Sequence, residues 1–157
     1  MPEELKAYIA GFLDGDGCIM AQLVKRSGYR YGYQIRLSIV FYQKAKHRHF
    51  LEWLKTKLKY GYVRNRNDGM SEYAIVGMNE VAKILGLLKS HLHLKRQLAT
   101  EIIRISEIQK NPDVKTYLKF CRLVDKTAQY TYSKKRKITT AMVEKYLEDH
   151  NIFPRND

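Results

Sequence analysis

Cysteine, proline and acidic residues are scarce in this chain of 157 residues. Its two cysteines, Cys18 and Cys121, are too few for a disulfide framework, so the sequence excludes the small disulfide-stapled class and fits a reducing compartment. No apolar run approaches the length of a membrane span, and no basic amphipathic helix stands apart from the core segments, so we expect no membrane partner. No linker or low-complexity stretch argues for a second domain, and we expect residues 1–157 to form one domain.

The shortage of acids leaves a large positive charge. The chain has 16 Asp and Glu against 29 Lys and Arg, a formal net charge of +13 at pH 7. A charge of this size in a small domain points to a polyanionic partner, and nucleic acid is the commonest one. The alternative is a basic protein whose charge serves only solubility.

Residues 3–17 predict a helix that ends in a tight, acidic turn. Its large apolar residues recur at helical spacing and form one stripe for the core: Leu5, Tyr8, Ile9, Phe12 and Leu13. A second stripe is small and consists of Ala7, Ala10 and Gly11, followed by Asp14. This small stripe either admits a second helix at close range, such as that of another copy, or packs against the chain's own core.

Two carboxylates, Asp14 and Asp16, alternate with Gly15 and Gly17 at the end of this helix. Oxygen ligands are what a hard divalent cation such as Mg²⁺ prefers, although Asp-Gly-Asp-Gly also occurs as a plain turn. Two acids are too few to hold two metal ions in one monomer. Two copies that pack these helices together would each supply half of a composite site.

After Gly17 the hydrophobic period changes from helical to alternating. Alternation predicts strands over 19–24 and 33–42, helical spacing predicts a helix over 46–59, and turn residues at 67–70 predict a second hairpin. A third helix is expected after Asn79 as its N-cap, with further helices over 94–110, 117–129 and 139–150. This order predicts an α+β fold: one four-stranded antiparallel sheet with helices on its apolar face, and extra C-terminal helices.

The outward faces of the predicted strands are polar and basic. Gln, Arg and Ser alternate with core residues along 33–42, and Arg64 and Arg66 share one face of the second hairpin. Such a face is chemically suited to reading base edges, and the net charge and neighbouring tyrosines favour this over an ordinary solvated face. The basic run at 133–137 reads either as phosphate contact or as a solvated charge cluster.

The stretch 9–17, Ile-Ala-Gly-Phe-Leu-Asp-Gly-Asp-Gly, resembles the signature of the LAGLIDADG homing endonucleases. Shorter matching stretches at 41–44, 60–66, 92–95 and 133–137 extend the resemblance over almost the whole chain. The chain looks most similar to the single-motif, homodimeric subgroup encoded in group I introns of algal organelles. The resemblance implies an αββαββα fold with a saddle-shaped sheet in the DNA major groove. It also implies that the motif helices form the dimer interface, here through Ala7, Ala10, Gly11 and Asp14.

The resemblance implies a metal site at the end of the motif helix. Asp16 would be the carboxylate that binds Mg²⁺ or Mn²⁺, the carbonyl of Gly15 would assist, and Asp14 would cap and pack at the helix junction. Gln43 and Lys95 fall where the family keeps polar residues around the attacking water and the scissile phosphate, with Lys95 in either water activation or charge stabilisation.

His47 also falls at a position that the family uses around the reacting phosphate. Close relatives carry Arg or Lys there, so this chain departs from the family's pattern. Either a partly protonated His47 or the neighbouring Lys46 would take that role.

The resemblance also carries over the positions that contact DNA. They coincide largely with the outward faces expected from alternation: Gln22, Val24, Arg26, Tyr29, Arg30, Gln34, Arg36, Ser38, Val40, Arg64, Arg66, Glu72 and Ala74, joined by Lys134 and Lys137 of the basic run. A two-fold protein reads two half-sites, so the target is expected to be long and near-palindromic.

The sequence therefore predicts a metal-dependent, site-specific endonuclease that cuts both strands of DNA as a homodimer. Two other functions stay open: a maturase that binds intron RNA, and a DNA-binding regulator without catalysis. The acidic start at Glu3 and Glu4 resembles neither a signal peptide nor an Arg-rich transit peptide. We expect the protein to be encoded in the organelle where it acts, the chloroplast.

Overall fold

A single antiparallel sheet organises the computed structural model, which describes residues 1–131 and 136–153. Its strands are β1 (Gly17–Lys25), β2 (Tyr33–Lys44), β3 (Tyr62–Asn65) and β4 (Met70–Val76), in the order β1-β2-β4-β3. Both expected hairpins are present, and the long central strand β2 joins them. The predicted α+β fold with a four-stranded antiparallel sheet is confirmed.

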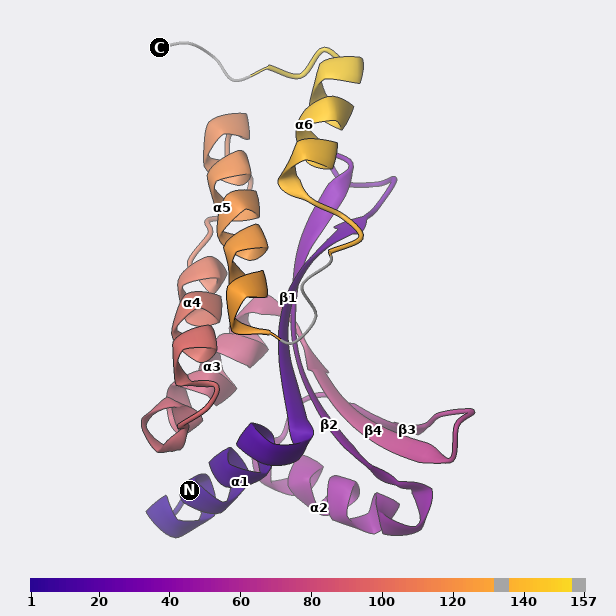
Figure 1. Ribbon diagram of the computed structural model, residues 1–157, viewed down its shortest axis with the longest axis vertical. Coiled ribbons are helices and arrows are strands. Elements are labelled where there is room, and N and C mark those ends of the chain that lie inside the picture. Colours follow the sequence, from indigo (N-terminus) through magenta and orange to yellow (C-terminus); the bar gives the residue numbers. More distant parts are fainter. Residues whose placement is uncertain (132–135, 154–157) are drawn as a thin grey trace.

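Helices cover one side of this sheet. They are α1 (Glu3–Asp16), α2 (Arg48–Leu58), α3 (Met78–Leu88), α4 (Arg96–Ser106), α5 (Val114–Lys126) and α6 (Thr140–Asp149), with short 3₁₀ turns η1 (Ala45–His47), η2 (Lys89–His91) and η3 (Thr127–Tyr130). In Figure 1 the strands curve away from these helices and leave the opposite, concave side open. We call this uncovered side the open face.

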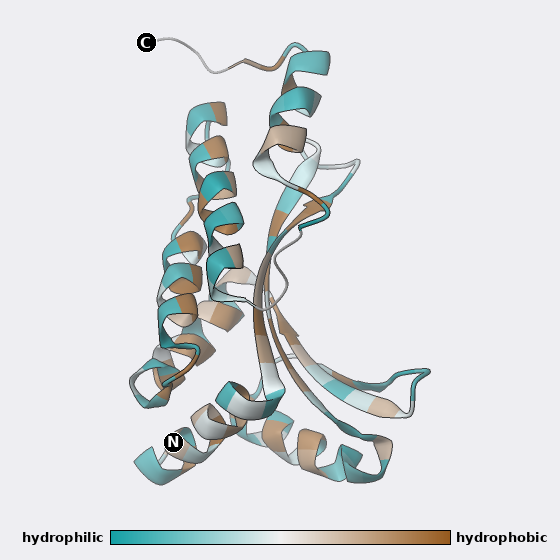
Figure 2. Ribbon diagram, in the orientation of Figure 1, coloured by the Kyte–Doolittle hydropathy of each residue, from teal (hydrophilic) through white to brown (hydrophobic). Residues whose placement is uncertain are grey.

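The core lies between the sheet and the helices. Ile39 and Phe41 on β2 and Tyr73 and Ile75 on β4 alternate with open-face residues and are fully buried. Figure 2 shows hydrophobic residues along the middle of the strands and hydrophilic residues at the turn between β3 and β4. No helix in the described ranges is long and apolar enough to cross a lipid bilayer.

Two helix starts differ from the sequence prediction. Asn79 is not the N-cap of α3, because the helix begins at Met78 after Gly77, whose backbone has a φ of +133°. Helix α5 begins earlier than expected, since the Asp113 side chain accepts a hydrogen bond of 2.7 Å from the backbone N–H of Thr116. Asp-x-x-Thr after a proline was the sequence signal for this start.

The two stripes of α1 divide differently from the prediction. Ile9 and Leu13 are fully buried as expected, but Tyr8 is 55% exposed and packs edge-on against Phe50 and Trp53 of α2. Ala10 is fully buried within this chain, so its predicted place at a surface for a second copy is wrong. Its small side chain lies on the side of the helix turned to the chain's own core.

Candidate functional site

The end of α1 is attached to the start of α4 through Asp14. Its carboxylate accepts hydrogen bonds from the backbone N–H groups of His93, Leu94 and Lys95, at 2.7, 3.2 and 3.0 Å. Three charge-assisted bonds hold this side chain in place and use both of its oxygens. Asp14 therefore fixes the loop before α4 to α1, and this structural role uses most of the acceptor capacity of its carboxylate.

Lys95 is brought to the same helix end. Its ammonium group donates a hydrogen bond of 2.6 Å to the carbonyl oxygen of Asp14. The last carbonyls of an α-helix have no helical partner, and here a cation satisfies one of them. The Lys95 ammonium is thus bound to a residue that lies only two positions before Asp16 in the chain.

Asp16 is the last residue of α1 and is exposed. It makes no hydrogen bond or ion pair with any described residue, although the chain carries an excess of cations. A carboxylate at the negative end of a helix dipole is electrostatically unfavourable, and α1 has no basic residue in its last turn. The carbonyl of Gly15 lies in this same last turn. An unpaired acid in such a position is suited to binding a cation from solution.

One chain alone does not complete a metal site. Within residues 1–131 and 136–153, no three His, Cys, Asp or Glu side chains gather so that they could hold a metal ion. Asp16 with the Gly15 carbonyl fits the oxygen ligands of Mg²⁺ in kind but not in number. Further ligands must come from the substrate, from water or from a second copy.

The other predicted catalytic residues lie before α2, with Gln43 near the end of β2 and His47 in η1. Gln43 is paired with Ser71 across β2 and β4, which places it on the core side of the sheet rather than on the open face. His47 is exposed, and its ring lies 6.1 Å from that of His49. Neither Gln43 nor His47 is hydrogen-bonded to Asp16 or Lys95 in the described structure. The next residue, Arg48, donates to Asn65 and so ties α2 to β3.

Strand register arranges the open face into rows of side chains. Near the loop 26–32 the rows consist of Val24 with Gln34 and of Gln22 with Arg36, so that only the second row is polar on both strands. At the opposite end, a third polar row is formed by Tyr42, Glu72 and Arg64. Arg36 makes no hydrogen bond or ion pair with the described residues, so its donors are free for a ligand.

Three of the predicted base-reading residues lie on the open face but have little accessible surface. Ser38, Val40 and Ala74 are 2, 6 and 3% exposed. Ser38 lies between Met20 and Val76 of the neighbouring strands, and its hydroxyl is buried without a partner among the described residues. The prediction that Ser38 reads a base directly is therefore wrong, because its hydroxyl is buried.

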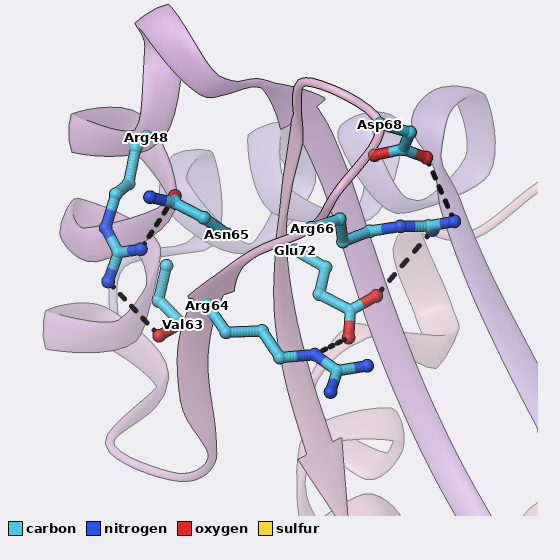
Figure 3. A network of polar contacts seen from close by, with 7 residues as sticks. All are labelled: Arg48, Val63, Arg64, Asn65, Arg66, Asp68 and Glu72. Carbon is cyan, nitrogen blue, oxygen red and sulfur yellow. Dashed lines mark hydrogen bonds and ion pairs between the residues drawn. The ribbon is translucent and has the colours of Figure 1, made fainter.

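Glu72 is also not available to read a base. It is 7% exposed, and it accepts a hydrogen bond from Nε of Arg64, while Nη1 of Arg66 lies 3.8 Å from its other oxygen. Figure 3 shows these two guanidinium groups on either side of the Glu72 carboxylate, with Asp68 holding the far side of Arg66 at 3.1 Å. The hydrogen bond from Arg64 to Glu72 raises the pKa of the Arg64 guanidinium. Glu72 orients two arginines, and the terminal nitrogens of Arg64 make no hydrogen bond within the part of the chain that the structure describes.

The loop between β1 and β2 is anchored to the rest of the fold through Tyr31. Tyr31 is buried, donates a hydrogen bond of 2.7 Å to the carbonyl of Pro112, and packs against Tyr117 at 4.9 Å between ring centroids. Two neighbouring residues, Tyr29 and Arg30, are exposed, and the Arg30 guanidinium lies 5.2 Å from the Tyr31 ring. Arg26 is exposed on the same loop. Exposed DNA-binding candidates thus stand on a loop whose base is fixed.

The end of the basic run is attached to the sheet through Arg136, which was not singled out from the sequence. Arg136 donates a hydrogen bond of 2.8 Å to the carbonyl of Ala21 on the edge strand β1, and another to the Thr127 hydroxyl. Burial lowers the pKa of this guanidinium. Lys137 is exposed beside it, whereas Lys134 lies outside the described residues. No sequence signal separated Arg136 from its charged neighbours.

Comparison with known proteins agrees with this geometry. The family model described as LAGLIDADG endonuclease matches residues 9–99, from the helix α1 to the start of α4. The chain belongs to the LAGLIDADG endonuclease family. The matched span includes Asp16, Gln43 and Lys95 and all four strands.

Two relatives within this LAGLIDADG family cover almost the whole chain. The DNA endonuclease I-CvuI of Chlorella vulgaris is 38% identical over 150 residues, which are 93% of this chain and 92% of the relative. The DNA endonuclease I-CreI of Chlamydomonas reinhardtii is 33% identical over 150 residues, which are 93% of this chain and 90% of the relative. The similarity to these two relatives thus extends beyond residue 99, where the match to the family model ends.

The fold agrees with a solved structure. The crystal structure of I-CvuI in complex with its target in the presence of Ca²⁺ superposes with a TM-score of 0.91 and 34% identity, covering 96% of both chains. The archaeal intron-encoded I-Vdi141I, complexed with DNA, has a TM-score of 0.82 at 17% identity, which shows the LAGLIDADG fold alone. It covers 97% of this chain and 100% of that one.

Proposed function

We propose that this protein is a site-specific DNA endonuclease, a homing endonuclease that cuts both strands of a long, near-palindromic duplex with Mg²⁺ or Mn²⁺. The observation that carries this proposal is Asp16. It is an exposed, unpaired carboxylate at the end of α1, two residues after Asp14, whose carbonyl accepts the hydrogen bond from Lys95. A basic protein with a curved open face next to such an acid can bind DNA and bring a cation to its phosphates.

The residues at the end of α1 have different roles in the proposed cleavage. A bound divalent cation supplies Lewis-acid polarisation of the attacking water and of the phosphate. Asp16 and the Gly15 carbonyl would hold it, and Asp14 keeps Lys95 beside them through the loop it fixes. The Lys95 ammonium then lies where it can stabilise negative charge that develops on the phosphate.

Cleavage tests the function directly. A library of long palindromic duplexes is incubated with the protein and Mg²⁺, and the cut ends are sequenced. Asp16→Asn should keep DNA affinity within about threefold and lose at least about 100-fold in cleavage rate. The matched control is Asp149→Asn, because Asp149 is likewise the exposed last residue of a helix, α6. Sequence-specific binding without any cut by the wild-type protein would contradict the endonuclease.

The same proposal includes a homodimer that pairs α1 with its copy. Ala7 and Gly11 on α1 are exposed, and a Cβ added at Gly11 would meet no described atom within 4 Å outside its own stretch of helix backbone and its two neighbours. The chain itself thus gives no packing reason for glycine there, whereas glycine in a helix interior costs stability. Leu94, 78% exposed beside Asp14 and Lys95, adds apolar surface near the same helix end.

A pair of glycine substitutions distinguishes an effect on the dimer interface from an effect on helix stability. Gly11→Gln should shift the protein from dimer to monomer in sedimentation equilibrium, because the longer side chain would occupy the partner's space. Gly86→Gln is the control, since Gly86 lies in α3 and also has no atom within 4 Å of an added Cβ. A Gly11→Gln protein that stays dimeric would refute the assigned interface and leave the endonuclease proposal to be judged by cleavage.

A further inference from the structure

The middle of the open face is apolar. Two adjacent rows of the register contain Cys18, Met20, Val40, Ala74 and Val76, with the covered Ser38 between Met20 and Val76, and the exposed Tyr62 of β3 ends the second row beside Ala74. We call these five residues the apolar band. Cys18 is exposed and Met20 and Val76 are half-buried, so these three residues give the band its accessible surface, whereas Val40 and Ala74, at 6 and 3% exposed, add little to it.

Charged residues border the band on both sides along β2. On one side lies Arg36, beside Gln22, with no protein partner among the described residues. On the other side lie Arg64 and Arg66, oriented by Glu72. The positive charge on both borders attracts the phosphates of a polyanion. The band between the borders can then reach only the groups that lie between those phosphates.

The chemistry of the major groove defines what an apolar band can read. Arginine pairs with the O6 and N7 atoms of guanine, glutamine pairs with adenine, and apolar side chains contact the C5-methyl group of thymine. Thymine is the base that presents an apolar group in this groove. A cytosine at the same place would bring its amino donor against Val40, Ala74 and Val76, whose side chains cannot accept a hydrogen bond.

From these rows we infer that each half-site of the DNA target contains a block of about four consecutive T·A or A·T pairs with thymine methyls against the apolar band. This inference rests on the proposed function, since it names the DNA that the open face binds. Guanines follow on both sides of the block, opposite Arg36 and opposite the Arg64–Arg66 pair.

The length of the block follows from strand geometry. A strand rises about 3.4 Å per residue, and one base of a DNA strand also occupies about 3.4 Å. The two rows of the band therefore cover about four base pairs when the strands follow the groove. Arg36 and the row of Tyr42 are six positions apart on β2, so the guanines should stand about six base pairs apart by the same rise.

The first experiment selects DNA by binding alone. Palindromic duplexes with randomised half-sites are captured on the wild-type protein in Ca²⁺, and a parallel pool is selected by cleavage in Mg²⁺. The expected result is about four adjacent positions enriched in A and T between guanine positions. G·C preference in the block, or captured DNA without any sequence preference, would overturn the inference.

The second experiment removes only the methyl groups. Replacing a thymine in the block by deoxyuridine keeps base pairing, leaves the protein unchanged, and should weaken binding about fourfold per methyl group that faces the band. The same replacement outside the block should change binding less than twofold. Equal effects inside and outside the block would refute the contact.

A variant locates the contact on the protein. Met20→Gln places an amide within the band and should shift the preference at the facing position toward adenine, and it should lessen the deoxyuridine penalty there. The two proposals fail separately. Bound but uncut DNA with the block overturns the endonuclease alone, and cut DNA without the block overturns the apolar readout alone.

Discussion

The ammonium group of Lys95 donates a hydrogen bond of 2.6 Å to the carbonyl oxygen of Asp14, whose carboxylate in turn accepts the backbone N–H of Lys95 at 3.0 Å. This reciprocal pair fixes a cation at the negative end of α1, close to the unpaired Asp16. Lys95→Met should lower the single-turnover cleavage rate about 100-fold, because the charge at the phosphate is lost. DNA affinity, measured by fluorescence anisotropy, should change much less. Lys83→Met on α3 is the control, and an equal loss in both variants would refute a local role.

Asp14 and Asp16 should affect stability in opposite directions. Asp14→Ala removes the acceptor of three backbone N–H groups and should lower the free energy of unfolding by about 2 kcal/mol. Asp16→Ala removes an unpaired acid from the wrong end of a helix dipole, so its melting temperature should equal or exceed that of the wild type. Thermal melts of both variants decide this. A strongly destabilised Asp16→Ala would mean that this carboxylate has a structural partner.

The buried carboxylate of Glu72 should restrain DNA binding as well as orient it. Glu72→Gln removes one negative charge from the open face and weakens the ion pairs with Arg64 and Arg66. Affinity for random duplex DNA should rise, and the slope of log K against log salt should steepen by up to about one phosphate contact. Discrimination at the guanine opposite Arg64 should fall. Titrations at several salt concentrations measure both effects, and an unchanged slope would contradict them.

The N-cap of α5 gives a pH dependence of stability. The hydrogen bonds from Thr116 hold the pKa of Asp113 below its usual value. A carboxyl group whose pKa is lower in the folded state stabilises that state above its unfolded pKa, and this contribution disappears as the pH falls through the folded value. Asp113→Asn cannot titrate, so its melting temperature relative to the wild type should rise as the pH falls below about 4. A pH-independent difference between the two proteins would contradict this assignment.

The structure was predicted best from the sequence where one periodic pattern extends over many residues. Alternation along 33–42 gave the sheet and its open face, because every second side chain of a strand must turn the same way. It did not predict how much surface each residue keeps. Ser38 and Glu72 have little exposed surface because they lie between neighbours on adjacent strands, and the strand register decides which residues those neighbours are. In the small stripe of α1, Ala10 is buried in the core and Gly11 lies at the surface. This difference arises from tertiary packing, which the sequence pattern of one helix does not specify.

The hydroxyl group of Tyr31 should contribute to base discrimination without touching DNA. It holds the loop 26–32 to the carbonyl of Pro112, and the exposed Tyr29 stands on that loop. Tyr31→Phe keeps the ring but frees the loop from this bond, which is worth about 1 kcal/mol, or roughly fivefold in affinity for the preferred bases that the loop reads. Cleavage of single-substituted targets should therefore show weaker discrimination at the outer base pairs and unchanged discrimination beside Arg64. Tyr73→Phe is the matched control, because the Tyr73 hydroxyl donates to the Tyr60 carbonyl next to the second hairpin. If both variants lost discrimination at the same base pairs, the effect would come from general destabilisation and not from the position of this loop.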